Sequence, residues 1–220
     1  MLQNIIGIYP AYHGGHHVAN IISTDPIYSS RIDSDSYSSI HMNAHVNANN
    51  LGRLRKDMID KIVENLDFYT NQNNVFNAHF GDFCFIKTSR LLDKFPNKKY
   101  YLIEFPKNNN ELDNLIRRRA FAHHDFTYYD YMYYYGEFRH CHNSDIIKSI
   151  VGEEPLTIPV EYVYTDDCKN LIEILNVGLD INIDYNAIQP LHEKWWGRVA
   201  ESVANLPLPP SKTGVIISSK

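Results

Sequence analysis

A short apolar segment that runs into a proline and then a glycine-rich turn constrains the fold of this chain more than any other feature. Asn4 to Tyr9 contains three isoleucines and ends at Pro10, which cannot continue a central strand because it lacks a backbone N–H. From His16 onward, apolar residues recur at helical spacing. The segment therefore predicts a strand, a loop and a helix in direct succession.

The same alternation of strands and helices continues along the chain. Apolar runs with strand character occupy residues 4–9, 75–78, 99–105 and 158–164. Helical spacing is found over residues 51–68, 88–94, 110–123, 145–151, 165–178 and 184–203, with Thr165 as a predicted N-cap and Gly178 as a helix end. Strands that alternate with helices predict an α/β fold whose mostly parallel sheet has helices on both faces.

Length and charge narrow the class of protein. The chain has 220 residues, which suits one domain, predicted over residues 1–205, followed by an extended proline-containing tail over 206–220. A formal net charge of −5 without a basic stripe argues against general nucleic-acid binding. Three widely spaced cysteines argue against a disulfide framework and favour a reducing compartment. We find no signal peptide or membrane-spanning run, so we expect a cytoplasmic protein.

Several common catalytic motifs are missing from the sequence. It has no G-x-S-x-G, no G-x-x-x-x-G-K-[ST] and no G-x-G-x-x-G. A serine hydrolase, an ordinary nucleoside triphosphatase and a dinucleotide enzyme therefore each lose support.

Successive segments resemble the P-loop sulfotransferases, in the order in which that family carries them. Ile5 to Pro10, with the glycine-bearing loop after it, is similar to the family's phosphosulfate loop. Val75 to His79 is similar to the strand that delivers the catalytic histidine, and Lys98 to Pro106 to the strand before the 3′-phosphate site. Val160 to Val177 and Ile188 to Trp195 resemble later elements of the family.

The resemblance spans about residues 4 to 197 and implies a P-loop-type three-layer fold. It further implies transfer of a sulfuryl group from 3′-phosphoadenosine-5′-phosphosulfate to a hydroxyl or amine of a small-molecule or carbohydrate acceptor. In that reaction His79 would be the general base. The residues that would cradle the donor are those of the loop, His13, Gly14, Gly15, His16 and His17.

Two departures from the family motivate an alternative function. The loop lysine of the family is absent, since Ala11 follows Pro10, and Glu104 stands where the family has an arginine. The alternative is a non-catalytic sulfotransferase-fold component of a larger assembly, in which the C-terminal tail docks on a protein partner. A small-molecule kinase is disfavoured, because the Gly-Lys-Ser/Thr step that serves phosphates and magnesium is missing.

The loop has the composition of an anion site. Gly14 and Gly15 let backbone N–H groups turn toward a phosphate, and the N-terminus of the following helix adds positive potential. His13, His16 and His17 are candidates to donate hydrogen bonds in place of the missing lysine. The alternative is a tight strand-to-helix turn with surface histidines.

His79 follows a predicted strand, and its residue type suits a general base. An imidazole titrates near neutral pH and can therefore accept a proton from an acceptor hydroxyl. The alternative is a histidine at a strand end whose ring is satisfied by a backbone carbonyl.

Three other clusters are interpreted structurally. The arginines at 117–119 point about 100° apart on a helix, so a solvated helix face is favoured over a joint 3′-phosphate contact. The tyrosines within 128–135 are interpreted as core and rim residues rather than a stacking platform for adenine. Histidines at 123–124 and within 140–142 lack the spaced pairs of a zinc site, so no metal is expected.

Overall fold

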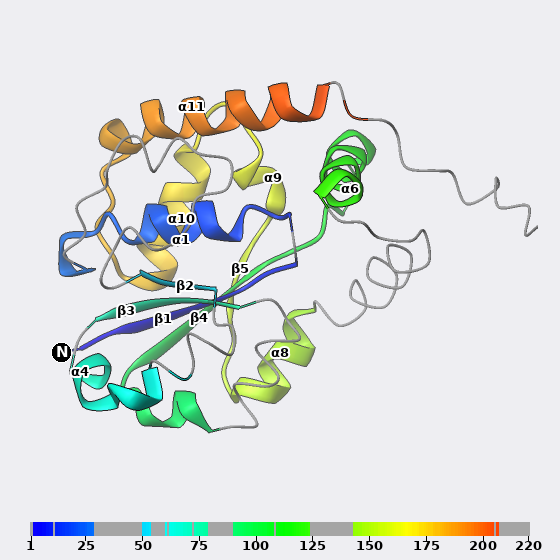
Figure 1. Ribbon diagram of the computed structural model, residues 1–220. Helices are drawn as coiled ribbons and strands as arrows, with labels where there is room; N and C mark the ends of the chain where they lie inside the picture. Colours follow the sequence, from blue (N-terminus) through cyan, green and yellow to red (C-terminus); the bar gives the residue numbers. More distant parts are fainter. Residues whose placement is uncertain are drawn as a thin grey trace, which may run out of the picture.

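The computed structural model describes residues 2–10, 12–28, 50–53, 60, 62–71, 73–78, 90–107, 109–123, 143–204 and 206. Within these ranges, five strands form one parallel sheet, namely β1 (Asn4–Ile8), β2 (Asn50–Arg53), β3 (Asn74–Ala78), β4 (Lys98–Ile103) and β5 (Leu156–Ile158). Their order across the sheet is β2-β3-β1-β4-β5, so the first strand of the chain is the central one (Figure 1).

Helices cover both faces of this sheet (Figure 1). One face, here called the α1 face, carries α1 (Gly15–Ile22), α6 (Asn110–His123), α9 (Val160–Val163), α10 (Lys169–Leu179) and α11 (Tyr185–Ala204). The other, the α8 face, carries α4 (Leu66–Thr70), η3 (Leu91–Lys94) and α8 (Ser144–Val151). A 3₁₀ turn, η1 (Pro26–Tyr28), follows α1. The three-layer α/β architecture predicted from the sequence is confirmed.

The core divides into two clusters because side chains of a strand alternate between the faces. Ile5 of β1 and Tyr101 of β4 lie in the cluster of the α1 face, whereas their chain neighbours Ile6 and Tyr100 lie in the cluster of the α8 face. Since β1 is buried along its whole length, its apolar run reads as continuous rather than alternating. Among the described helices, none is both long and apolar enough to cross a membrane.

The helix predicted over 51–68 is wrong at its N-terminal end. Residues 50–53 form β2, which pairs with β3 through Asn50 beside Val75 and Arg53 beside Asn77. Gly52 disfavours a helix there, and the backbone of this segment pairs with β3 instead. Helical spacing of the apolar residues was therefore not enough to predict its structure. The C-terminal part of the prediction holds, because residues 62–64 and α4 are helical.

The strand predicted over 158–164 is also wrong. Strand β5 ends at Ile158, and after Pro159 the chain forms the short helix α9. Proline has no N–H to continue the ladder, whereas its fixed φ suits the residue before a helix. The apolar residues after Pro159, Val160 and Val163, are buried from the helix instead.

The next helix, α10, begins and ends differently from the prediction. It starts at Lys169, with Cys168 as N-cap in place of Thr165. Gly178 lies inside the helix, where an added Cβ would sit 2.4 Å from the Leu156 Cδ1 atom of β5. That glycine therefore permits close helix–strand packing, and the left-handed C-cap is Asp180, with φ 54°.

Candidate functional site

The loop singled out by the sequence starts at the carboxyl edge of the sheet, beside the end of β3. Ile8 pairs with Ala78, and the Tyr9 N–H donates to the Ala78 carbonyl oxygen at 3.2 Å. His79 is the next residue in the sequence after Ala78. The structure does not describe His79 itself, and its role as a base stays a prediction.

The backbone of the loop makes a turn that needs glycine at two positions. Gly14 has φ 76°, and a Cβ there would lie 2.6 Å from the Val163 Cγ1 atom. A Cβ on Gly15 would lie 2.2 Å from ring atoms of Tyr9. The turn ends at the N-terminus of α1. The first N–H groups of any helix point out of its N-terminal end and carry partial positive charge.

His13 is buried inside the protein rather than exposed on the loop. Its side chain has 0% exposure and meets the Phe105 ring edge-on, with the ring centroids 4.6 Å apart. Phe105 follows β4, so this ring contact joins the segment after β1 to the segment after β4. The chain leaves these two strands toward opposite edges of the sheet, and such a switch point is where α/β sheets bind ligands.

His17 is also buried, in the first turn of α1. Its ring stacks on Trp195 of α11 with centroids 3.8 Å apart and an interplanar angle of 2°. Its Nε2 lies 2.9 Å from Nδ1 of His192, whose own Nε2 lies 2.7 Å from the Thr165 carbonyl oxygen. A carbonyl only accepts, so His192 Nε2 donates to Thr165 and His17 Nε2 donates to His192 Nδ1.

This histidine pair is held in the neutral state. Burial, and secondarily the proximity of His192, lowers the pKa of His17 well below its ordinary value. Burial likewise lowers the pKa of His192, although the Thr165 carbonyl and nearby carboxylates oppose the shift. The pair therefore ties α1 to α11 as neutral groups and adds no positive charge to the loop.

A second series of hydrogen bonds connects α6 to the loop. The Arg119 Nη1 atom donates to the Tyr164 hydroxyl at 2.5 Å, and that hydroxyl donates to the Tyr12 carbonyl oxygen. Tyr12 lies two residues before Gly14 and has φ 66°. Burial raises the pKa of Tyr164, and the Arg119 guanidinium opposes the shift.

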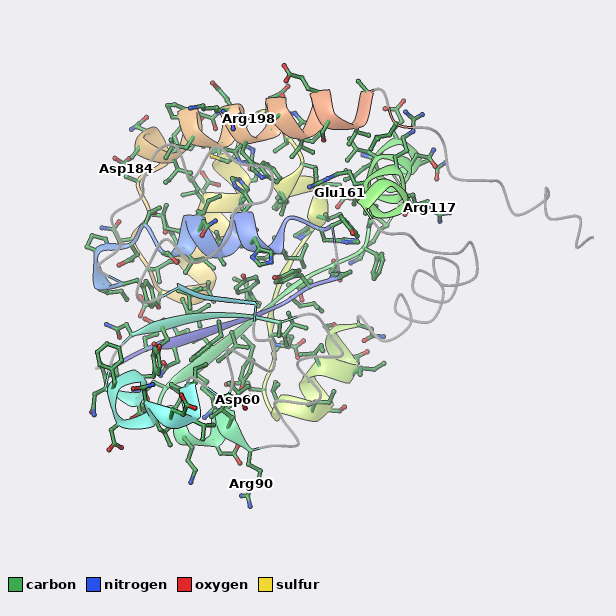
Figure 2. The ribbon with its side chains drawn as sticks, in the orientation of Figure 1. Asp60, Arg90, Arg117, Glu161, Asp184 and Arg198 are labelled. Carbon is green, nitrogen blue, oxygen red and sulfur yellow. The ribbon has the colours of Figure 1, made fainter. Side chains whose placement is uncertain are left out.

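The sequence interpretation of the arginines as a solvated helix face is wrong for one of them. Arg119 is 7% exposed, whereas Arg117 pairs with Asp113 at 2.8 Å. Figure 2 shows Arg117 on α6 and Glu161 on α9 at the end of the sheet where β1 and β4 end. Helix α6 therefore turns one guanidinium inward at the edge that carries the loop.

The structure thus divides the predicted cradle into two kinds of residue. The rings of His13 and His17 contact protein groups, while Gly14 and His16 are half-buried on the loop. Two residues that the sequence did not single out for the site, Tyr164 and His192, contact the loop or its helix, and Arg119 contacts Tyr164. A buried histidine in an amphipathic helix has no periodic signature, so only the resemblance of residues 188–195 pointed to that region.

Several predicted features lie outside the described residues. They include His124, the tyrosines within 128–135, the segment 140–142 and nearly all of the C-terminal tail. Glu104, where the family has an arginine, forms an ion pair with Lys107 at 2.8 Å. In the part of the chain that the structure covers, no group of three histidine, cysteine or acidic side chains is arranged to hold a metal ion.

Comparison with solved structures gives a remote neighbour, and comparison with family models and curated proteins gives no match. No family model matches the chain. No curated protein matches it either. Among solved structures, an unliganded sugar kinase from Janibacter sp. HTCC2649 is similar at 10% sequence identity, covering 82% of this chain and 96% of that chain, with a TM-score of 0.39. A likeness of this degree carries no argument about activity.

Proposed function

We propose that the chain is a sulfotransferase-like protein that binds 3′-phosphoadenosine-5′-phosphosulfate at the loop between β1 and α1 and transfers its sulfuryl group. The observation that carries this proposal is the hydrogen bond from Tyr9 to Ala78. It joins the start of the glycine turn to the residue just before His79. This supports the proposal because the donor loop starts at the carboxyl edge of the sheet, where α/β proteins bind ligands, and the strand that precedes His79 ends at the same edge.

The backbone, rather than the histidine side chains, would hold the donor. A Cβ at Gly14 or Gly15 would collide with Val163 or Tyr9, so this turn depends on glycine, and the backbone N–H groups that follow it at the start of α1 would hold the phosphate oxygens. The buried rings of His13 and His17 fix the shape of the turn from behind. A preformed turn binds an anion without first being ordered, which reduces the cost of binding.

His79 would act on the acceptor. It accepts the proton of an acceptor hydroxyl or amine as that oxygen or nitrogen forms its bond to sulfur. The donor supplies the sulfuryl group, and its S–O bond to the 5′-phosphate breaks, which leaves 3′-phosphoadenosine 5′-phosphate. The acceptor class is a small molecule or a carbohydrate, as the resemblance implies.

A second candidate function is a non-catalytic binding or structural component with this fold. The observation that favours it is the contact between the buried His13 ring and the Phe105 ring, which join the segments that follow β1 and β4. A loop that is packed from within and has lost the family lysine also suits a domain that no longer transfers sulfate. Such a domain would act through a protein partner.

Calorimetric titration with 3′-phosphoadenosine 5′-phosphate separates the two candidates. We expect micromolar binding to the wild type and loss of binding in Gly15→Trp, whose side chain would collide with Tyr9. Gly197→Trp is the matched control, because an added Cβ there meets nothing within 4 Å. Circular dichroism checks that both variants are folded.

A sulfuryl-transfer assay follows, with His79→Ala expected to abolish turnover and keep nucleotide affinity. Absence of binding by the wild type at millimolar nucleotide would reject the transferase and favour the non-catalytic component.

A further inference from the structure

Arg119 is a buried cation without a counter-charge in the described part of the chain. Its side chain is more than nine-tenths buried, and no described carboxylate forms an ion pair with it. The nearest acidic partner on its own helix, Asp113, is paired with Arg117. Buried charges are expensive unless they are paired, so an arginine in this position calls for an anion.

The guanidinium also has an unused hydrogen-bonding edge. Nη1 is engaged with the Tyr164 hydroxyl, whereas the buried Nε–H has no acceptor among the described residues. The Nε–Nη2 edge of arginine presents two parallel N–H groups, whose spacing matches two oxygens of a carboxylate, phosphate or sulfate.

The position of Arg119 connects this edge to the glycine turn. One hydroxyl, that of Tyr164, separates the guanidinium from the Tyr12 carbonyl of the loop. The Tyr164 ring also lies 3.7 Å from where a Cβ of Gly14 would be. Tyr164 therefore contacts both the cation and the glycine turn that leads into α1, where the backbone N–H groups favour the same kind of ligand.

We propose that Arg119 is an anion-binding residue that supplies the positive charge missing from the loop. It binds a tetrahedral oxyanion, a phosphate or sulfate group, together with the N–H groups of the glycine turn. The inference rests on the proposed function for the identity of the ligand, of which this oxyanion is a part. Tyr164 positions the guanidinium. Its hydroxyl also holds the Tyr12 carbonyl of the loop, so that one anion can contact both the guanidinium and the loop.

A purely structural role for Arg119 makes the opposite prediction about stability. If Arg119 acts only as a clamp on Tyr164, replacing it with methionine removes a hydrogen bond and lowers the melting temperature. If it is an anion site, the anion-free protein carries an uncompensated buried charge. Its replacement by a chain of similar length then leaves the melting temperature equal or higher.

The test compares wild type with Arg119→Met, Arg119→Lys and Arg90→Met. Arg90 is the charge-matched control, because it is exposed and lies with η3 on the α8 face. Melting curves are recorded in sodium sulfate, sodium phosphate and sodium chloride at equal ionic strength. Calorimetry then gives the affinity of each variant for 3′-phosphoadenosine 5′-phosphate.

We expect sulfate and phosphate to raise the melting temperature of wild type and Arg90→Met above the chloride value, and to leave Arg119→Met unchanged. Arg119→Met should weaken nucleotide binding about tenfold to a hundredfold, as expected for loss of hydrogen bonds to a charged group. Arg119→Lys, which keeps the charge and the fold but loses the two-pronged edge, should show an intermediate response.

Either of two results would overturn the inference. One is an Arg119→Met protein that melts several degrees lower without anion and still responds to sulfate. The other is equal nucleotide affinity in wild type and Arg119→Met, which leaves the proposed function standing. If sulfate acts through Arg119 and the nucleotide does not bind, the anion site stands and the donor proposal fails.

Discussion

The two faces of the sheet differ in the kind of side chains that are buried on them. The α8 face packs aliphatic residues with Phe76, Phe95 and Tyr100. The α1 face contains, besides its apolar residues, most of the buried polar side chains of the described structure, among them His17, Asn20, Ser23, Asp25, Arg119 and His192. Both faces exclude water, but the α1 face buries many more polar side chains than the α8 face does.

This difference leads us to expect that stability and ligand binding depend differently on the two faces of the sheet. Apolar packing on the α8 face stabilises the fold at little desolvation cost. Each buried polar group on the α1 face needs a partner in a fixed geometry, and two of the partners observed, His192 and Tyr164, contact α1 and the loop. We therefore expect substitutions on the α8 face to change stability alone, and substitutions on the α1 face to change stability and ligand binding together.

The largest expected effect is on the α8 face. Phe76→Ala removes a fully buried ring that meets Phe95 edge-on at 4.9 Å. It should lower the free energy of unfolding by about 3–5 kcal/mol, measured by urea denaturation. Nucleotide affinity, measured at a urea-free condition where the variant is folded, should stay at the wild-type value. A change in affinity greater than threefold would break the separation between the faces.

Gly15→Ala should combine both kinds of effect on the α1 face. Its methyl would lie 2.2 Å from the body of the Tyr9 ring, so we expect a loss of about 1–3 kcal/mol in urea denaturation. Nucleotide binding should weaken with it, because the turn must shift. The control, Gly197→Ala within α11, should gain up to about 1 kcal/mol from helix propensity. Equal stability of the two variants would contradict the geometry of the turn.

The pH dependence produced by His17 and His192 on the α1 face should be the smallest effect. Because the pKa of His17 and of His192 is lowered in the folded state, the unfolded chain binds their protons first as the pH falls below about 6.5. Their stabilisation is therefore present above that pH and lost below it, at up to about 1.4 kcal/mol per pH unit for each proton.

Urea denaturation at pH 7.5 and 5.5 measures this slope. The variant His192→Gln cannot be protonated, so its slope should be shallower than that of the wild type, although it should be less stable at pH 7.5. A wild-type slope that His192→Gln leaves unchanged would mean that other groups set the pH dependence.

Sequence reasoning predicted the fold more successfully than the site. The central strand and helices such as α6 and α11 have clear apolar periodicity, and their bounds are close to the predicted ones. The errors at β2 and at residues 158–164 arose where a pairing partner or a proline decided the structure. An edge strand such as β2 is specified by its neighbour, which local periodicity does not encode.

For the candidate site, the sequence predicted the course of the backbone but not the direction of the side chains. Gly14 and Gly15 mark a turn in any sequence, and the turn lies where the pattern placed it. Whether His13 points outward or inward depends on Phe105, which is distant in the chain. The inward turn of Arg119 likewise depends on Tyr164. The direction of a side chain at a site depends on tertiary contacts, so the residue types and their spacing in the sequence did not predict it.

The central place of β1 has a consequence for how the protein is made. Strand β1 is the first to leave the ribosome, but its neighbours are β3 and β4, so both its edges are paired only after Ile103 has emerged. At about 5–20 residues per second, that interval lasts roughly 5–20 s. Throughout it, at least one edge of the apolar strand that carries Ile5, Ile6 and Ile8 has no partner strand, which exposes the nascent chain to aggregation during synthesis.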